Sequence, residues 1–250
     1  MDVRDYLRIS SALLAYELRG LFRRRVELIL SPMLSWAIAM VITPLGLTLY
    51  GSSIGLEKVV ITGMIIEGAI SGAAVATLYF LGEMSFEAID RVLQVPLPLW
   101  AALLCRSLVS ATGGLMVSAF IWLLSLPYLG FSPESLSAVV LASYVASLGI
   151  IGVVSLAGYW VRSIQKLSIA ASFASAALTY LSPLYFPLDA LPMHIRVIMI
   201  LNPPSLAIEL VRKAVVSAAL RMDTAALMLA VNLVWFFLGL LALLKKAERR

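Results

Sequence analysis

Charged residues are scarce in this 250-residue chain: only 13% are Asp, Glu, Lys or Arg, whereas 62% are hydrophobic. Soluble domains carry about 25% charged and about 45–50% apolar residues, so this composition excludes an ordinary soluble domain. There is one cysteine, Cys105, and one histidine, His194. They cannot form an internal disulfide and offer too few soft ligands for a structural zinc or iron–sulfur site. We therefore expect a membrane protein without metal or redox chemistry.

The hydrophobic residues are grouped in runs long enough to cross a hydrocarbon core, which takes about 20 helical residues. These runs are too long for barrel strands and do not alternate, so they predict helices. About six spans are expected, at residues 28–50, 59–82, 107–128, 135–161, 167–186 and 224–244. The predicted fold is an all-α membrane bundle that forms one transmembrane domain over residues 1–250.

Basic residues are distributed unequally between the two sides of this topology. With the N-terminus inside, only five of the 19 Lys and Arg residues fall on the outer side: Lys58, Arg196, Arg212, Lys213 and Arg221. This positive-inside bias predicts that both termini are cytoplasmic. Contacts with anionic lipid account for the net charge of +5. We therefore expect membrane lipid, and no nucleic acid, as a partner.

Residues 1–26 have the periodicity of an amphipathic helix. Arg4, Arg8 and Arg19 gather on one side, leucines occupy the other, and Glu17 is an exception on the apolar side. Such a helix is expected to lie along the inner membrane surface. Its role is either a lipid anchor or a docking surface for a partner, and the pattern leaves both open.

The longest cytoplasmic connection, residues 83–106, lies between the second and third predicted spans. Its first part has helical spacing, and Pro96 and Pro98 end that helix. Apolar residues share one face of it: Phe86, Ile89 and Leu93. A polar turn would need only a few residues. We interpret residues 83–98 as a lever on which another protein pushes, with a simple turn as the alternative.

Polar side chains follow one face of the fifth predicted span. Five hydroxyl residues recur there at steps of three and four: Ser168, Ser172, Ser175, Thr179 and Ser182. Small hydroxyl residues at this spacing favour close helix packing in lipid. They would equally suit a face toward a polar pathway or a dimer partner. The two interpretations are compatible if this helix lies beside a dimer axis.

Two ionisable residues stand out within or beside the spans. Glu67 lies in the second span with Gly63 and Ser71 on its face, and a carboxyl at that depth costs several kcal/mol unless it is protonated, paired or hydrated. We interpret Glu67 as a neutral, hydrogen-bonded structural residue, with a substrate or coupling-ion site as the alternative. Arg106, at the inner border of the third span, is interpreted as a snorkelling anchor.

Prolines interrupt the segment before the last span. Residues 193–201 and 206–220 are predicted to form two apolar helices, separated by Asn202, Pro203 and Pro204. In the second, Glu209 stands three and four residues before Arg212 and Lys213, where it can pair with both. These helices are too short to cross and too apolar to stay in water. We therefore expect residues 187–222 to form a re-entrant outer gate, with Pro187, Pro192, Asn202 and Pro203 as gate residues.

The stretch "FPLDALPMHIRVIMILNPPSLAIELVRKAV" resembles the segment before the last span in the membrane permeases of type-2 ATP-binding-cassette (ABC) exporters. The resemblance rests on Phe186-Pro187, Asp189, Leu191-Pro192, Asn202-Pro203 and Arg212. The inner loop is similar to that family's coupling region through Glu83, Phe86, Glu87 and Pro96-Leu97, although Ser85-Phe86 replaces the usual Gly-Thr. With the amphipathic N-terminus and the predicted spans, the resemblance covers essentially the whole chain.

The resemblance implies a permease of the plasma membrane that works in efflux, as a homodimer or with a paralogous permease. Separate cytoplasmic ABC ATPase subunits would bind ATP, so the chain itself would be no enzyme and would hold no cofactor. Consistently, these residues contain no G-x-x-x-x-G-K-[ST] loop. Coupling to the ATPase would fall on five residues: Glu83, Phe86, Glu87, Arg91 and Pro96.

Other classes of membrane protein fit the sequence less well. A secondary transporter driven by an ion gradient, the main alternative, is expected to show internal repeats and several intramembrane charges, whereas Glu67 stands alone here. An intramembrane enzyme needs clustered catalytic groups, and the chain contains no G-x-S-x-G elbow. A membrane scaffold without transport activity remains open on composition alone.

Overall fold

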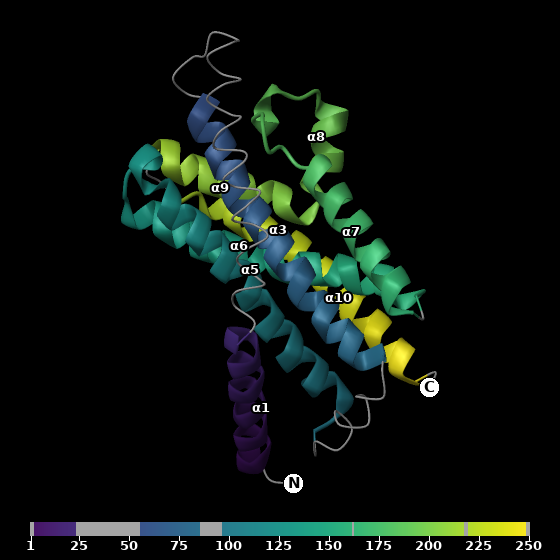
Figure 1. Ribbon diagram of the computed structural model, residues 1–250. Coiled ribbons are helices and arrows are strands. Elements are labelled where there is room, and N and C mark those ends of the chain that lie inside the picture. The colour runs from purple at the N-terminus through teal and green to yellow at the C-terminus, as the bar shows by residue number, and fades with distance from the viewer. Residues whose placement is uncertain (1–2, 24–55, 86–96, 162, 218–219, 249–250) are drawn as a thin grey trace.

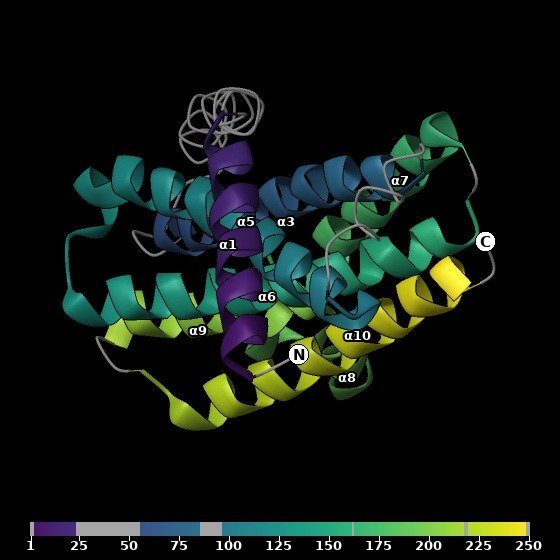
Figure 2. The same ribbon diagram turned by 90° about the horizontal axis from the view of Figure 1, so that it is seen from below.

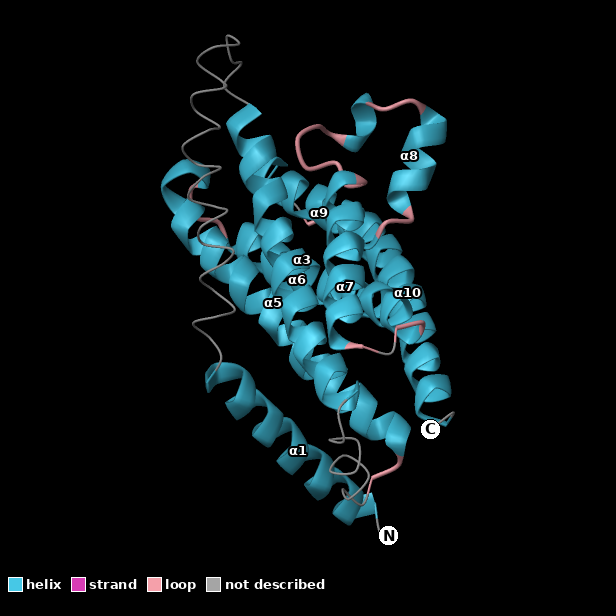
Figure 3. Ribbon diagram, turned by 45° about the vertical axis from the view of Figure 1, so that its right-hand side comes forward, coloured by secondary structure: helices cyan, strands magenta, loops and turns pink. Residues whose placement is uncertain are grey.

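The computed structural model describes residues 3–23, 56–85, 97–161, 163–217 and 220–248 (Figure 1). Within these ranges the regular structure is entirely helical (Figure 3), which confirms the predicted all-α class. The elements are α1 (Val3–Arg23), α3 (Leu56–Ser85), α5 (Leu99–Leu129), α6 (Pro133–Tyr159), α7 (Ile164–Tyr180), the 3₁₀ turn η1 (Leu188–Ala190), α8 (Met193–Ile200), α9 (Pro203–Ser217) and α10 (Met222–Glu248).

Four of the described helices are long and apolar enough to cross a membrane. They are α3, α5, α6 and α10, with spans at Lys58–Gly82, Leu99–Leu129, Pro133–Tyr159 and Met222–Lys246. They correspond to the second, third, fourth and last predicted spans. The first predicted span, residues 28–50, lies outside the described residues. A bent pair, α8 and α9, would raise the number of spans to five if it counts as one.

Two predicted boundaries are wrong. The third span begins at Leu99 instead of residue 107, because Pro98, in extended conformation, serves as the N-cap and the helix starts directly after it. The fifth predicted span, 167–186, ends early: α7 has 17 residues and stops at Tyr180. At 1.5 Å per residue it is about 25 Å long, less than a hydrocarbon core of about 30 Å. Pro183 and Pro187 lack the N–H groups that would have continued it.

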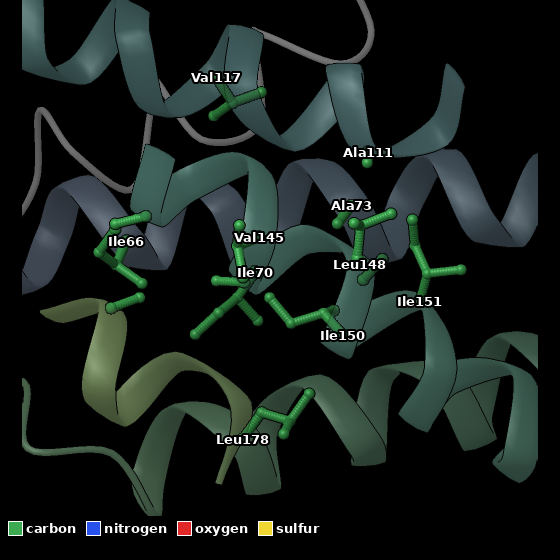
Figure 4. Packing of buried hydrophobic residues seen from close by; sticks show 14 of the residues in the cluster. Ile66, Ile70, Ala73, Ala111, Val117, Val145, Leu148, Ile150, Ile151 and Leu178 are labelled. Atoms are coloured by element: carbon green, nitrogen blue, oxygen red, sulfur yellow. The ribbon is translucent and has the colours of Figure 1, made fainter. Parts of the chain in front are cut away.

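Helix α6 lies at the centre of the bundle and contacts α3, α5, α7, α9 and α10. One continuous apolar core joins these helices, and Figure 4 shows side chains from α3, α6 and α7 in it, among them Ile70, Ile150 and Leu178. Lipid tails are as apolar as these side chains, so close packing, more than escape from water, holds such helices together.

Small residues make that close packing possible. A Cβ added to Gly72 of α3 would lie 2.8 Å from the Gly113 carbonyl oxygen of α5, and Gly152 of α6 lies directly against Gly239 of α10.

A buried hydroxyl adds a polar bridge between three helices. Ser118 of α5 donates to the Ile65 carbonyl of α3 (2.6 Å) and lies 2.6 Å from the Ser143 hydroxyl of α6. Since Ser118 has one proton, Ser143 donates in that second bond.

Helix α1 and the C-terminal end of α10 lie at the same end of the bundle, where α3 ends and α5 begins (Figure 1). Helix α1 packs against α5 there and crosses the other helices when the bundle is seen from below (Figure 2). Following the topology predicted from the basic residues, we call this the inner end, and the opposite end, which carries α8 and the start of α3, the outer end.

Candidate functional site

The break between α8 and α9 is the most irregular feature of the described helices. The two helix axes are bent by 103°. The predicted interruption at Asn202-Pro203 is confirmed, although α9 starts at Pro203 rather than at residue 206. Pro203 and Pro204 both fall in the first turn of α9, where backbone N–H groups have no acceptor within the helix, so the N–H that proline lacks costs no intrahelical hydrogen bond. We call residues 201–203 the hinge.

Hydrogen bonds to two other helices, α7 and α10, hold the hinge in place. The Asn202 amide donates to the Leu178 carbonyl at the end of α7 (3.0 Å). From α10, the Trp235 indole donates to the Leu201 carbonyl (2.8 Å), and the Asn232 amide donates to the Pro203 carbonyl (3.1 Å). The Leu178 and Leu201 carbonyls, at the C-terminal ends of α7 and α8, have no partner within their helices and are thus satisfied inside the protein, whereas the Pro203 carbonyl, in the first turn of α9, gains a donor from another helix.

Ser182 is bonded to the hinge and does not belong to the hydroxyl row of α7. It lies beyond the last residue of that helix, is buried, and its hydroxyl donates to the Leu178 carbonyl while it accepts from Asn202 (2.9 Å). The prediction that a single stripe runs through Ser182 is therefore wrong, because the helix ends before it. The other four hydroxyl residues do lie on α7.

A buried charge cluster lies on α9, next to the hinge. Glu209 and Arg212 are 4% and 5% exposed. The Glu209 carboxylate is 3.4 Å from Arg212 Nη1 and 3.1 Å from Lys213 Nζ, which confirms both predicted ion pairs. Burying such a pair costs free energy unless further hydrogen bonds satisfy its remaining atoms. Such hydrogen bonds reach both Nη atoms of Arg212, as described next, whereas its Nε has none.

Arg212 binds the segment that replaces the last turn of the predicted fifth span, residues 181–187, which we call the proline turn. Its guanidinium donates to three carbonyl oxygens of that turn: Pro183 (2.8 Å), Phe186 (3.0 Å) and Leu184 (3.3 Å). It also reaches the Val59 carbonyl near the start of α3 (3.4 Å). Irregular backbone at membrane depth needs such internal donors, so this arginine permits α7 to be short.

The predicted gate residues separate into two groups. Asn202 and Pro203 lie in the hinge, whereas Pro187 and Pro192 are exposed and bracket η1, the first as its N-cap and the second as the N-cap of α8. Arg196 of α8 donates to the Asp189 backbone carbonyl (2.8 Å) and is 3.5 Å from its carboxylate. Helix α8 is thus tied to η1, and it contains no fully buried residue.

The hydroxyl row of α7 lies outside the chain's own core. Ser168 and Ser172 are exposed, and Ser175 and Thr179 are half-buried. The inward positions of the same helix are occupied by leucine and alanine, and these residues are buried: Leu167, Ala171, Ala174 and Leu178. Close packing inside this chain therefore does not explain the two exposed serines.

Glu67 lies on the narrow exposed strip of α3. Glu67, Ser71 and Val75, one turn apart, are half-buried, whereas the residues between them are buried. One turn toward the outer end, a Cβ on Gly63 would lie 2.5 Å from the Leu184 carbonyl, so the proline turn covers the strip at that point. Among the described residues no hydrogen bond or ion pair reaches the Glu67 carboxyl, and the hydrogen-bonded structural role we expected for it finds no support there.

The charge of the Glu67 carboxyl affects the pKa of Tyr185 in the proline turn. Partial burial raises the pKa of the Tyr185 phenol, and the negative charge of Glu67 and the neighbouring Tyr180 raise it further. Tyr185 follows Leu184, whose carbonyl lies against Gly63, one turn from Glu67. Tyr180 and Tyr185 are 83% and 59% exposed, which leaves their rings free to contact another molecule.

At the inner end, the structure corrects one interpretation and leaves another untested. Arg106 is no snorkelling anchor, because Nη2 lies 2.8 Å from the Glu17 carboxylate of α1 and its guanidinium lies 5.9 Å from the Phe80 ring centroid. This pair explains why an acid interrupts the apolar side of α1. Glu83 lies on α3. Four of the predicted coupling residues lie outside the described ranges: Phe86, Glu87, Arg91 and Pro96.

Sequence patterns did not reveal most of these contacts. Arg212 and Glu209 were recognised as a pair, but the carbonyl partners of Arg212 lie 26 to 153 residues away in the chain. The one sequence feature that points to a role for Asn232 is its position as an isolated amide side chain within an apolar run. The sequence indicates only that Lys246 is one of the basic residues of the predicted cytoplasmic side. In the structure it donates to the Gly158 and Val161 carbonyls (2.7 and 2.8 Å) and caps the C-terminal end of α6.

Comparison with known proteins adds one finding. The family model described as ABC-2 type transporter matches residues 11–216, a range that includes the hinge, the proline turn and the charge cluster. No curated protein matches the chain.

Proposed function

Because this chain belongs to the ABC-2 type transporter family, we propose that it is the transmembrane subunit of an ATP-driven exporter, forms the substrate pathway as a dimer, and is driven by separate cytoplasmic ATPase subunits. Family membership makes the chain a multi-pass membrane component of a transporter and not itself a catalyst. The observation that carries the finer proposal is the α8–α9 pair, bent by 103° around a hinge that is bonded to α7 and α10.

The α8–α9 pair serves as the outer gate and re-enters the membrane from outside. Helix α9 is buried among α3, α6 and α10, whereas α8 stands at the surface of the chain. One gate helix is thus part of the bundle and the other can move against it. Such a rigid-body motion around a short break is a common form of switching.

Force from the ATPase enters at the inner end through residues 83–98. Helix α3 connects this region directly to the gate, since Glu83 lies near its inner end and Val59, near its outer end, accepts a hydrogen bond from Arg212. At 1.5 Å per residue these two residues are about 36 Å apart along one helix. The Glu17–Arg106 pair joins α1 to α5, so the interface helix moves with the bundle.

The partner permease, a second copy or a paralogue, packs against the exposed face of α7. Ser168 and Ser172 are exposed there beside Phe173, which is 77% exposed. Hydroxyl groups on a face that the chain does not bury itself suit a helix interface or a polar pathway in the membrane. We place both termini in the cytoplasm of a cell whose plasma membrane holds the dimer, in line with the distribution of basic residues.

The test is reconstitution with the partner. The chain is purified with a cosynthesised ATPase subunit, placed in vesicles, and assayed for ATP-dependent movement of solute, with a hydrolysis-dead ATPase as the control. We expect copurification and transport that needs hydrolysis. Transport by the chain alone under an ion gradient would instead establish a secondary transporter and contradict the proposal.

A further inference from the structure

The inner end of α6 meets two other helices in a compact junction. The Lys246 ammonium of α10 donates to the Gly158 and Val161 carbonyls of α6 and its C-terminal loop (2.7 and 2.8 Å). A Cβ added to Gly158 would lie 3.0 Å from the side chain of Leu167, in the first turn of α7. We call this junction the inner corner; its aromatic and basic members are Tyr159, Trp160, Lys166, Lys245 and Lys246.

Trp160 is the most exposed aromatic residue of the inner corner. It is the C-cap of α6 and is 82% exposed, although an indole ring gains more than most side chains from burial. The Tyr159 ring packs edge-on against it, with the ring centroids 5.0 Å apart. An aromatic side chain at the end of a span is typical of the headgroup level of a bilayer, where the ring contacts lipid and its polar atom stays hydrated.

The lengths of the helices agree with that level. Helix α6 has 27 residues and is about 40 Å long at 1.5 Å per residue, which matches a bilayer of about 40–45 Å with its headgroup regions. The exposed Phe131 precedes its other end. On α5, the exposed Trp100 and Tyr128 are likewise about 42 Å apart along the helix. Aromatic residues thus stand at both ends of these spans, which favours lipid over a cytoplasmic protein as the cover of Trp160.

Basic residues accompany Trp160. Lys166, in the first turn of α7, and Lys245, in the last turn of α10, are both exposed. The sequence places one acid beside them, Glu248, and further basic residues at Arg162, Arg249 and Arg250. Anionic phospholipid attracts such a cluster more strongly with each basic residue that it contains.

We propose that the inner corner binds the headgroup of an anionic phospholipid, with Lys166 and Lys245 at the phosphate and Trp160 at the glycerol and upper acyl chain. Lys246 holds the corner together, because its ammonium is bonded to carbonyls at the end of α6. A zwitterionic headgroup carries the same phosphate together with a cation, which the lysines repel. This site concerns the lipid around the protein and does not depend on the export proposed above.

The test measures which lipid contacts Trp160. Full-length chain is placed in nanodiscs of phosphatidylcholine, and its tryptophan fluorescence is titrated with phosphatidylglycerol or phosphatidylcholine that carries a quenching nitroxide near the headgroup. The Trp160 signal is the part of the fluorescence that Trp160→Phe removes from each variant. In the wild type we expect half-quenching at a fraction of phosphatidylglycerol about twentyfold below that of phosphatidylcholine, since each lysine contributes about fivefold.

The lysines are then changed one at a time. Lys245→Gln should raise the half-quenching fraction of phosphatidylglycerol by about fivefold and leave that of phosphatidylcholine unchanged, and Lys166→Gln should do the same. Lys245→Arg keeps the charge and should match the wild type. Arg221→Gln is the matched control, because it removes one exposed basic residue just before α10, at the outer end. Its titrations should equal those of the wild type.

Three results would overturn the site. The first is equal half-quenching fractions for the two lipids in the wild type. The second is an effect of Arg221→Gln as large as that of Lys245→Gln, because the attraction would then belong to the protein's net charge. The third is no quenching of Trp160 by either lipid, which would place this residue in water or under another protein. No ATPase or nucleotide is present, so the outcome is independent of whether the chain exports a solute.

Discussion

Replacing Arg212 with methionine removes one guanidinium from four backbone carbonyls and one carboxylate. Methionine keeps an unbranched stem of comparable length, so the change tests the charged fork more than the packing. The variant leaves Glu209 paired with Lys213 at 3.1 Å. Its main effect therefore falls on the proline turn, where the carbonyls of Pro183, Leu184 and Phe186 lose their donor.

The magnitude follows from these contacts. Hydrogen bonds from a charged group are worth about 1.5–3 kcal/mol each, and breaking a buried pair by removing one partner costs about 3–5 kcal/mol. The five contacts share one side chain, so their contributions do not add, and we expect a loss of about 3–5 kcal/mol in the free energy of unfolding. For a chain of this size each kcal/mol shifts the midpoint by about 2–4 °C.

The assay is thermal unfolding of the purified protein in detergent, followed by the fluorescence of a thiol probe that reacts with Cys105, which is buried in the folded chain. We expect the midpoint of Arg212→Met to fall by roughly 6–20 °C. The unfolding midpoint of Arg212→Lys should lie between those of the wild type and Arg212→Met, because an ammonium keeps the charge but cannot bridge several carbonyls in a fixed geometry.

The matched control is Lys213→Met, at the next position of the same helix. Its ion pair with Glu209 is partly exposed, with 29% of the lysine side chain accessible, and such pairs contribute about 0–1 kcal/mol. Midpoints of Arg212→Met and wild type within 2 °C, roughly the effect of 1 kcal/mol or less, would refute the role assigned to Arg212. So would an equal loss in Lys213→Met, because the damage would then come from the ion pair alone.

Three further predictions concern coupling, the gate and helix packing. Phe86→Asp should uncouple ATP hydrolysis from export in reconstituted vesicles without unfolding the bundle, and normal coupling would argue against the lever. Ser205→Cys, at a fully buried position of α9, should react with a membrane-impermeant thiol reagent from outside only in some nucleotide states; a constant rate would indicate a static cap. Gly152→Leu should prevent α6 and α10 from packing and lower the yield of folded protein in size-exclusion chromatography, because the added side chain would collide with the Trp235 backbone. Gly20→Leu is its control, since that position opens into free space, and equal yields would contradict the packing argument.

Hydrophobic runs predicted the long helices well, because a membrane span is a local property of about 20 consecutive residues. Helices α3, α6 and α10 begin and end within a few residues of their predictions. The boundaries at α5 and α7 were less predictable. Both boundaries lie beside prolines. Whether a helix starts or ends at a given proline depends on which distant groups can satisfy the backbone carbonyls that the break leaves unpaired.

The candidate site was predictable in its residues and not in its contacts. The sequence predicts the helix break at Asn202 and Pro203, and the spacing of Glu209 and Arg212 predicts their ion pair. The sequence did not show that Trp235 bonds to Leu201, or that Arg106 meets Glu17 instead of lipid. Each of these contacts joins helices that are far apart in the chain.

The amino-acid sequence alone determined that this protein lies in a membrane, that it is helical, and where its helices are interrupted, since hydropathy, periodicity and proline act over neighbouring residues. Only the tertiary structure decided that Arg212 holds the proline turn, that Ser182 lies beyond the end of α7 and bonds to the hinge, and that no hydrogen bond or ion pair among the described residues reaches Glu67. The physical reason is that a buried polar group takes whichever partner the packing of other helices brings within about 3 Å, and no local pattern encodes that choice.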